Sequence, residues 1–130
     1  MIVVDASVIA SALIDDGTGG ERARDRLRGE RLVAPHLLDL EVASAWRRQT
    51  AAGRWTARRA SLALADLRDL PVERASHIEL LPRCWELRNN LTVYDATYVA
   101  LAEALDVTLI TSDRRLAQST GIHCTIEMLA

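Results

Sequence analysis

Four acidic side chains that lie far apart in the sequence are the residues best suited to do chemistry. They are Asp5, Glu41, Asp95 and Asp113. Carboxylates that converge in one cleft repel each other, so without a cation at least one of them is expected to take up a proton. Oxygen-only ligands favour a hard divalent ion, Mg²⁺ or Mn²⁺, over zinc. Such an ion would activate water, orient a scissile phosphate and stabilise charge on the leaving oxygen.

Two of these acids follow short apolar runs that are typical of buried strands. Asp5 follows residues 2–4, and Asp113 follows residues 107–110 after two small polar residues. In a parallel sheet, ligands bind at the carboxyl ends of the strands. Each acid taken singly is explained equally well as the N-cap of the helix that follows it.

Glu41 lies in the middle of the longest predicted helix, residues 35–52, which Pro35 is expected to open. Its neighbours on the same helix face are apolar: Leu37, Leu38 and Ala45. A carboxylate on such a face is partly buried and needs a partner, which is either a metal ion or an arginine. Asp39 points about 160° away from Glu41 by the 3.6-residue repeat, so at most one of them serves the same site.

Asp95 starts another predicted helix, residues 94–105, and shares a stripe with Tyr98, Val99 and Ala102. The preceding loop, residues 89–93, would let its side chain reach a neighbouring strand end. The alternative is an acid at a helix start with no further role.

The elements that must position these acids alternate between strands and helices. Strands are expected at residues 1–4, 32–34, 71–75, 107–110 and 122–126. Helices are expected at residues 6–13, 21–28, 35–52, 57–69, 77–89, 94–105 and 114–119, with a kink at Pro82. This alternation predicts an α/β fold. We expect a single domain, residues 1–130, with a central parallel sheet of four to five strands flanked by helices on both faces.

Composition restricts the class of protein further. The 130 residues carry a formal net charge of −2, and all sixteen basic residues are arginines. The absence of lysine excludes a phosphoryl-receiver domain, which needs one to contact the phosphoryl group. No apolar run approaches the ~20 residues that span a bilayer. Cys84 and Cys124 have no zinc-ligand spacing and are expected to be reduced thiols, which favours a cytoplasmic protein.

In their order and spacing, four segments resemble the PIN-domain family, and within it the VapC-type toxins of bacterial toxin–antitoxin pairs. The segments are residues 2–7, 35–43, 92–96 and 109–113. The resemblance covers essentially the whole chain. It implies that the catalytic, metal-coordinating acids are Asp5, Glu41, Asp95 and Asp113. It also implies that Ser7 and Thr111 support the site through hydrogen bonds.

The resemblance further implies an activity and partners. VapC-type proteins are metal-dependent endoribonucleases that act on tRNA, rRNA or mRNA with Mg²⁺ or Mn²⁺. They typically form homodimers, and a VapB-type antitoxin holds them inactive by laying its C-terminal segment across the active-site groove.

Several arginines are candidates for RNA contact. Arg114 and Arg115 directly follow Asp113 and are the best candidates for phosphate contact, whereas the arginines of residues 22–31 are explained as a solvated helix face with ion pairs. The three tryptophans could stack on bases, but in a chain without Phe we favour roles in the core or a dimer interface.

Three rival functions were weighed. A haloacid-dehalogenase-type phosphatase needs a second Asp two residues after the first, where this chain has Ser7. A catalytically silent PIN-fold binding module stays open, as does a PIN nuclease that acts in RNA processing without an antitoxin.

Overall fold

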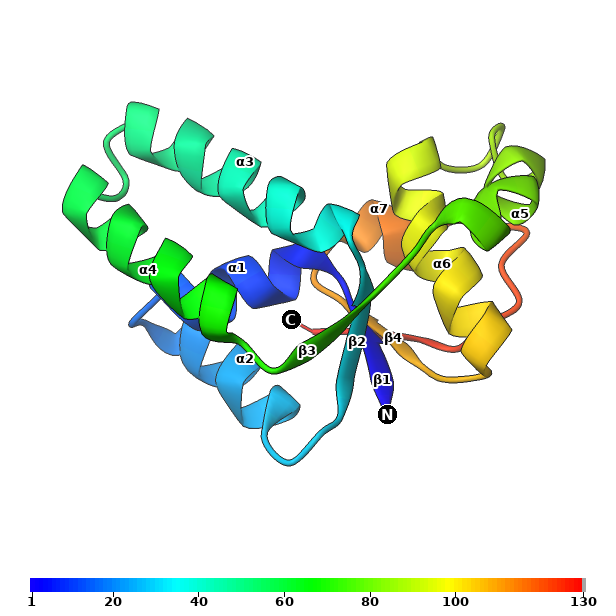
Figure 1. Ribbon diagram of the computed structural model, residues 1–130, viewed down its shortest axis with the longest axis horizontal. Helices are drawn as coiled ribbons and strands as arrows, with labels where there is room; N and C mark the ends of the chain where they lie inside the picture. Colours follow the sequence, from blue (N-terminus) through cyan, green and yellow to red (C-terminus); the bar gives the residue numbers. More distant parts are fainter. Residues whose placement is uncertain (130) are drawn as a thin grey trace.

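The computed structural model describes residues 1–129 and contains five parallel strands with helices on both sides (Figure 1). The strands are β1 (Ile2–Val4), β2 (Leu32–Pro35), β3 (Val72–Ala75), β4 (Leu109–Thr111) and β5 (Ile126–Met128). The helices are α1 (Ala6–Ile14), α2 (Thr18–Leu27), α3 (Leu37–Ala51), α4 (Ala57–Asp69), the 3₁₀ helix η1 (Ile78–Leu80), α5 (Leu81–Glu86), α6 (Val93–Leu105) and α7 (Arg114–Ala117). The predicted α/β fold is confirmed. The boundary at residue 130 stays a prediction, since Ala130 lies outside the described residues.

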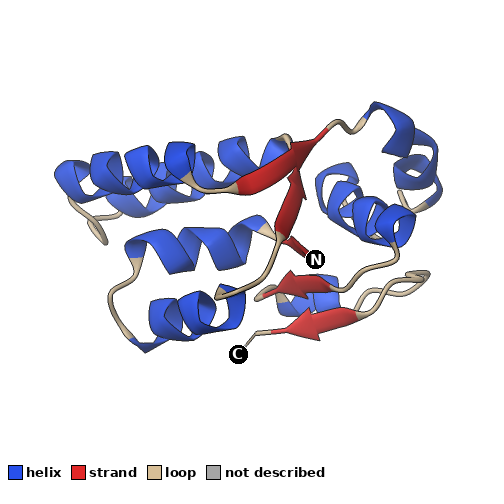
Figure 2. Cartoon of the chain, turned by 60° about the horizontal axis from the view of Figure 1, so that its bottom comes forward, coloured by secondary structure: helices blue, strands red, loops and turns tan. Residues whose placement is uncertain are grey.

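The strand order is β3-β2-β1-β4-β5, and every neighbouring pair is parallel. Strands β2 and β3 follow on one side of β1, and β4 and β5 follow on its other side. Figure 2 shows α1 to α4 on one side of the strands and α5 and α6 on the other. Such a reversal leaves a crevice at the carboxyl ends of the two strands where the order changes. Here those strands are β1 and β4.

The central strands are buried on both faces. Val3, Val4, Leu109 and Ile110 are fully buried. The helix α6 contacts β1, β2 and β4, and α1 also contacts β4. Strands covered on both faces are continuously apolar, which is why these two were visible in the sequence.

Three predicted boundaries were wrong. Pro35 ends β2 instead of opening α3; it pairs only with Ala75 of β3, beyond the point where β2 pairs with β1. The helix expected at residues 77–89 is divided into η1 and α5, and Pro82 lies in the first turn of α5, where its missing N–H costs little. The last strand begins at Ile126, four residues later than expected.

The second helix also begins earlier than predicted, at Thr18 instead of residue 21. A Cβ added to Gly20 would lie 1.8 Å from the Asp15 carbonyl oxygen, so glycine is required there by close backbone packing. The glycines that suggested a loop are therefore part of α2.

Two negative findings concern the described residues alone. No helix within residues 1–129 combines the length and the apolar character that crossing a bilayer requires. Cys84 and Cys124 are both free thiols, as predicted.

Candidate active site

Asp5 is placed between β1 and β4 by the sheet itself. Its backbone N–H donates to the Ile110 carbonyl oxygen at 2.9 Å, which joins the end of β1 to β4. Asp5 is the N-cap residue of α1, yet its side chain makes no capping hydrogen bond. Instead its Oδ2 accepts from Ser7 Oγ at 2.6 Å and from Thr111 Oγ1 at 2.9 Å. Helix capping therefore does not explain why a carboxylate stands here.

The same two hydroxyls connect Asp5 to the loop that carries Asp113. Ser7 Oγ accepts from the Ser112 backbone N–H at 3.1 Å, and Thr111 Oγ1 accepts from the Asp113 backbone N–H at 3.0 Å. Ser7 and Thr111 thus make the kind of hydrogen bond that was expected of them. Their effect is to fix the Asp5 carboxylate and the Asp113 backbone relative to each other.

Glu41 is held from the opposite side of the sheet. Its Oε1 accepts from the Tyr98 hydroxyl at 2.7 Å, and Tyr98 is completely buried on α6. Among residues 1–129, no arginine forms an ion pair with Glu41. From the sequence, Tyr98 was expected to share a helix stripe with Asp95 but was not expected to be a site residue. The available signal was that a buried phenol needs a hydrogen-bond partner, and that Tyr98 lies three residues after Asp95 on one helix face.

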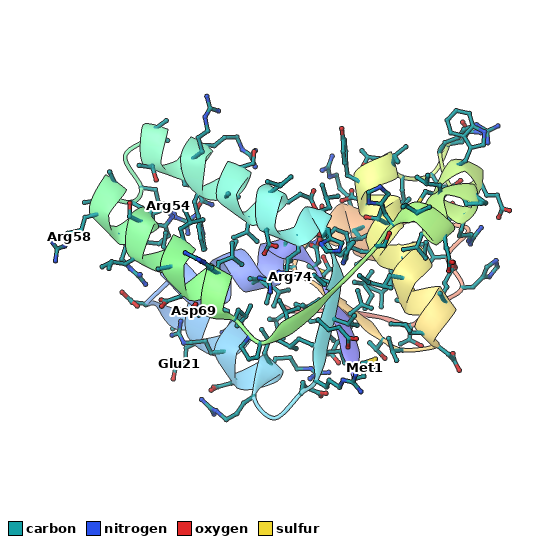
Figure 3. All side chains as sticks on the ribbon, in the orientation of Figure 1. Met1, Glu21, Arg54, Arg58, Asp69 and Arg74 are labelled. Atoms are coloured by element: carbon teal, nitrogen blue, oxygen red, sulfur yellow. The ribbon has the colours of Figure 1, made fainter. Side chains whose placement is uncertain are left out.

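Asp39 faces away from this site, as the helical repeat predicted. Its two carboxylate oxygens accept from Arg74 Nε at 2.8 Å and from Arg74 Nη2 at 2.9 Å. Arg74, on β3 (Figure 3), also donates to the Leu67 carbonyl oxygen at 2.9 Å. This bidentate pair ties α3 to β3 and α4 and has a structural role.

Of the other two acids, Asp113 caps a helix with its side chain and Asp95 does not. Thr92, not Asp95, caps α6, since its Oγ1 accepts from the Asp95 backbone N–H at 3.1 Å. The Asp95 carboxylate is therefore not used for capping. Asp113 does cap α7 through Oδ1, which accepts from the Arg115 backbone N–H at 2.9 Å.

The predicted acids influence one another's pKa values. Burial raises the pKa of Asp5, although the hydrogen bonds from Ser7 and Thr111 oppose this. The pKa of Glu41 is raised by burial and by repulsion from Asp5 and Asp95, against the hydrogen bond from Tyr98. Burial, with repulsion from Asp5 and Asp113, raises the pKa of Asp95. We call these four carboxylates, Asp5, Glu41, Asp95 and Asp113, the acidic centre.

The guanidinium group of Arg115 lies near the acidic centre but does not neutralise its charge. Arg115 Nε is 3.8 Å from Asp113 Oδ1, and the Arg115 charge partly offsets the raised pKa of Asp95. The Arg115 side chain is 91% exposed, so water screens most of this attraction. Arg114 is also exposed and forms no ion pair within the described chain.

The residues present fit a hard cation better than a structural zinc. Among residues 1–129, no three His, Cys, Asp or Glu side chains lie together in a group that could hold a metal ion by itself. Mg²⁺ seldom uses an all-protein site; it keeps several waters and binds one or two carboxylates together with substrate phosphates. The carboxylates of Asp5, Glu41 and Asp95, whose pKa values are raised, suit that kind of ion.

The tryptophans and the arginine-rich segment are mostly structural. Trp46 is buried and donates from Nε1 to the Ala10 carbonyl oxygen at 3.3 Å, whereas Trp85 is exposed. Arg26 pairs with Glu127 and Glu30. These pairs support the solvated-face explanation for that arginine of α2.

Comparison with known proteins agrees with this arrangement. The family model described as "PIN domain" matches residues 2–121. Two mycobacterial proteins, "VapC ribonuclease Mb0985" of Mycobacterium bovis and "Ribonuclease VapC9" of Mycobacterium tuberculosis, are each 45% identical over 129 residues, which is 99% of this chain and 98% of theirs. The crystal structure of VapC20 from Mycobacterium tuberculosis, described as a sarcin–ricin loop cleaving toxin, superposes with a TM-score of 0.72 at 17% identity. The superposition covers 95% of this chain and 97% of that one.

Proposed function

Because this chain belongs to the PIN-domain family, and within it to the VapC-type proteins, we propose that it is a toxin endoribonuclease that hydrolyses RNA phosphodiester bonds. The observation that carries the proposal is the acidic centre at the crevice between β1 and β4. Full-length similarity to proteins named VapC ribonucleases supports RNA as the substrate class.

In this proposal, different side chains orient the metal-binding carboxylates. Asp5, Glu41, Asp95 and Asp113 would hold Mg²⁺ or Mn²⁺, which, when bound, supplies activation of water and stabilisation of the leaving oxygen. Ser7 and Thr111 orient Asp5, while Tyr98 orients Glu41. Since hydrogen bonds already fix two of the carboxylates, little reorganisation is needed when the substrate arrives.

The exposed arginines next to the acidic centre would bind the RNA backbone. Arg114 and Arg115 begin α7, directly after Asp113. A guanidinium offers two parallel N–H donors to phosphate oxygens, and neither side chain is committed to a strong ion pair. We therefore keep both as candidates for phosphate contact.

A VapB-type antitoxin and a second copy of this chain are the proposed protein partners. The names of the relatives support the antitoxin. For the homodimer, η1 and α5 present two exposed apolar side chains three residues apart: Ile78 and Leu81 are 69% and 48% exposed. RNA as substrate and two free thiols fit a cytoplasmic location.

The function is tested by incubating the purified protein with Mg²⁺ and either a structured RNA or the DNA of the same sequence. We expect internal cleavage of the RNA, read as discrete fragments on a denaturing gel, and no cleavage of the DNA. A protein that binds RNA but cleaves none, across tRNA, rRNA and mRNA substrates, would instead be a silent binding module. Cleavage without growth arrest on expression would favour RNA processing without an antitoxin.

The dimer is tested at Leu81. The wild-type chain is expected to sediment at twice its 14.4 kDa mass. Leu81→Asp replaces an exposed apolar side chain with a charge and should shift the protein toward monomer. The control is Leu62→Asp on α4, which is exposed to a similar degree. Equal sedimentation of both variants and wild type would remove η1 and α5 from the dimer model.

A further inference from the structure

A second feature, a polar cavity, opens directly beside the acidic centre. It has a volume of about 460 Å³, within the range of small-ligand sites, and Asp95 forms part of its wall. The rest of the lining comes from the loop between α5 and α6, which includes Arg88 and Asn89, and from α7 and the residues just after it, which include Arg115. Neither Arg88 nor Asn89 was among the site residues expected from the sequence.

Two arginines that line this cavity keep hydrogen-bonding capacity for a ligand. Arg88 donates from Nη1 to the Trp85 carbonyl oxygen at 2.9 Å and lies over the Trp85 ring, 4.7 Å from its centroid. These contacts hold Arg88 in place, but no carboxylate pairs with it within the described residues. Arg115 has only the long contact to Asp113.

Other arginines of the chain contrast with this pair. The N–H donors of Arg83 already bind Glu103 at 2.8 Å, Glu86 and the Gly121 carbonyl oxygen. Those of Arg74 already bind Asp39 and backbone carbonyl oxygens. The cavity thus holds cations that are not already neutralised inside the fold.

The walls of the cavity are fixed before any ligand enters. Asn90 Nδ2 donates to the Thr120 carbonyl oxygen at 3.0 Å and to Thr120 Oγ1 at 3.1 Å, which joins the α5–α6 loop to the segment after α7. Ser119 Oγ donates to the Arg115 carbonyl oxygen at 2.7 Å. A preformed site loses less entropy on binding.

We propose that this cavity is the subsite for the ribonucleotide next to the scissile phosphate, and that Arg88 and Arg115 bind the phosphate of that nucleotide. The inference rests on the proposed nuclease function and adds a residue, Arg88, that positions the substrate. Asp95 belongs both to the acidic centre and to the wall of the cavity, so an RNA strand bound at the acidic centre has this cavity beside it. That continuity favours RNA over an acidic peptide as the occupant.

The test measures binding of a fluorescein-labelled single-stranded RNA by anisotropy, in EDTA, at several KCl concentrations. A lost phosphate contact lowers the slope of log affinity against log salt by about 0.7 for a single strand. We expect Arg88→Ala to show this change and to weaken binding about tenfold, regardless of RNA sequence. Arg88→Lys should keep the slope, because it keeps the charge, but bind less tightly than wild type.

The matched control is Arg58→Ala. Arg58 lies near the start of α4, at the far end of the molecule and pointing outward (Figure 3), so it removes the same charge away from the cavity. Its slope should equal that of wild type. An Arg88→Ala slope equal to that of Arg58→Ala would overturn the subsite, as would weakened binding of an antitoxin with unchanged binding of RNA.

Cleavage kinetics separate this inference from the function on which it rests. With Mg²⁺ present, Arg88→Ala should raise KM about tenfold with little change in kcat, since the contact is made equally in the ground state and the transition state. If wild type cleaves RNA and Arg88→Ala matches the control, only the subsite fails. If wild type cleaves nothing but the slopes change as expected, the phosphate subsite stands and the nuclease assignment falls.

Discussion

Asp5→Asn is expected to lower the rate of RNA cleavage by about a thousandfold or more while leaving the fold intact. Asn is neutral and binds a divalent cation poorly, so the acidic centre loses its most buried member. The fold is kept because Ser7 and Thr111 both donate to a single oxygen of Asp5, and an amide oxygen can accept both bonds. Cleavage is read from initial rates with saturating Mg²⁺, and stability from thermal unfolding.

Asp39→Asn provides the matched control, because it makes the same change at an acid that pairs with Arg74. It should lower the free energy of unfolding by about 1 kcal/mol, through the weakened bidentate pair, and leave cleavage near the wild-type rate. The two variants therefore should show opposite patterns. Cleavage by Asp5→Asn at the wild-type rate would refute the role of the acidic centre.

Removal of divalent metal is expected to abolish cleavage completely, and Mg²⁺ or Mn²⁺ should restore it. Binding should also stabilise the folded state at pH 7.5. At a metal concentration of a hundredfold Kd, the gain is about 2.7 kcal/mol, which is roughly 10 °C in melting temperature for a domain of this size. Cleavage that persists in EDTA would exclude a metal-dependent mechanism. Asp5→Asn should show little of the thermal shift.

The pH dependence of stability gives an independent check on the same carboxylates. The folded pKa values of Asp5, Glu41 and Asp95 are raised above the values of 3.8 for Asp and 4.5 for Glu that hold without the fold. The folded state therefore binds protons more tightly than the unfolded state. In EDTA, the contribution of these groups to stability is complete below about pH 4 and is lost as the pH rises through their folded pKa values.

The difference in melting temperature between Asp5→Asn and wild type isolates this effect. In EDTA the melting temperature of the variant should rise relative to that of wild type as the pH rises from 4 to 8, because only wild type must ionise a buried carboxyl at position 5. Mg²⁺ should reverse the order at pH 7.5. A difference that is constant over this range would mean that Asp5 is not desolvated in solution.

The main features of the fold could be predicted because the central strands are buried on both faces. The runs before Asp5 and Thr111 are apolar without interruption, and the helices α4 and α6 carry their own side-chain caps, Thr56 and Thr92. The errors fell where packing contacts, and not residue propensities, decide the outcome. Pairing with Ala75 keeps Pro35 in a strand, and packing against the Asp15 carbonyl keeps Gly20 in a helix.

The candidate site divides in the same way. Asp5 and Ser7 are two residues apart, so their hydrogen bond follows from local geometry. Tyr98 and Glu41 are separated by 57 positions, and only the packing of α6 against the sheet brings them together. The cavity at Arg88 likewise depends on Asn90 and Thr120, which are 30 residues apart. The pattern of neighbouring residues in the sequence does not predict such contacts.

The strand order also determines at what stage of translation the acidic centre can assemble. The ribosome makes β1, β2 and β3 first, yet β1 lies between β2 and β4 and stays open along one edge until residues 109–111 emerge. Asp113 of the acidic centre follows β4 and is synthesised after it. Under the proposed function, a nascent chain that has not reached Asp113 lacks part of the acidic centre and should not cleave RNA.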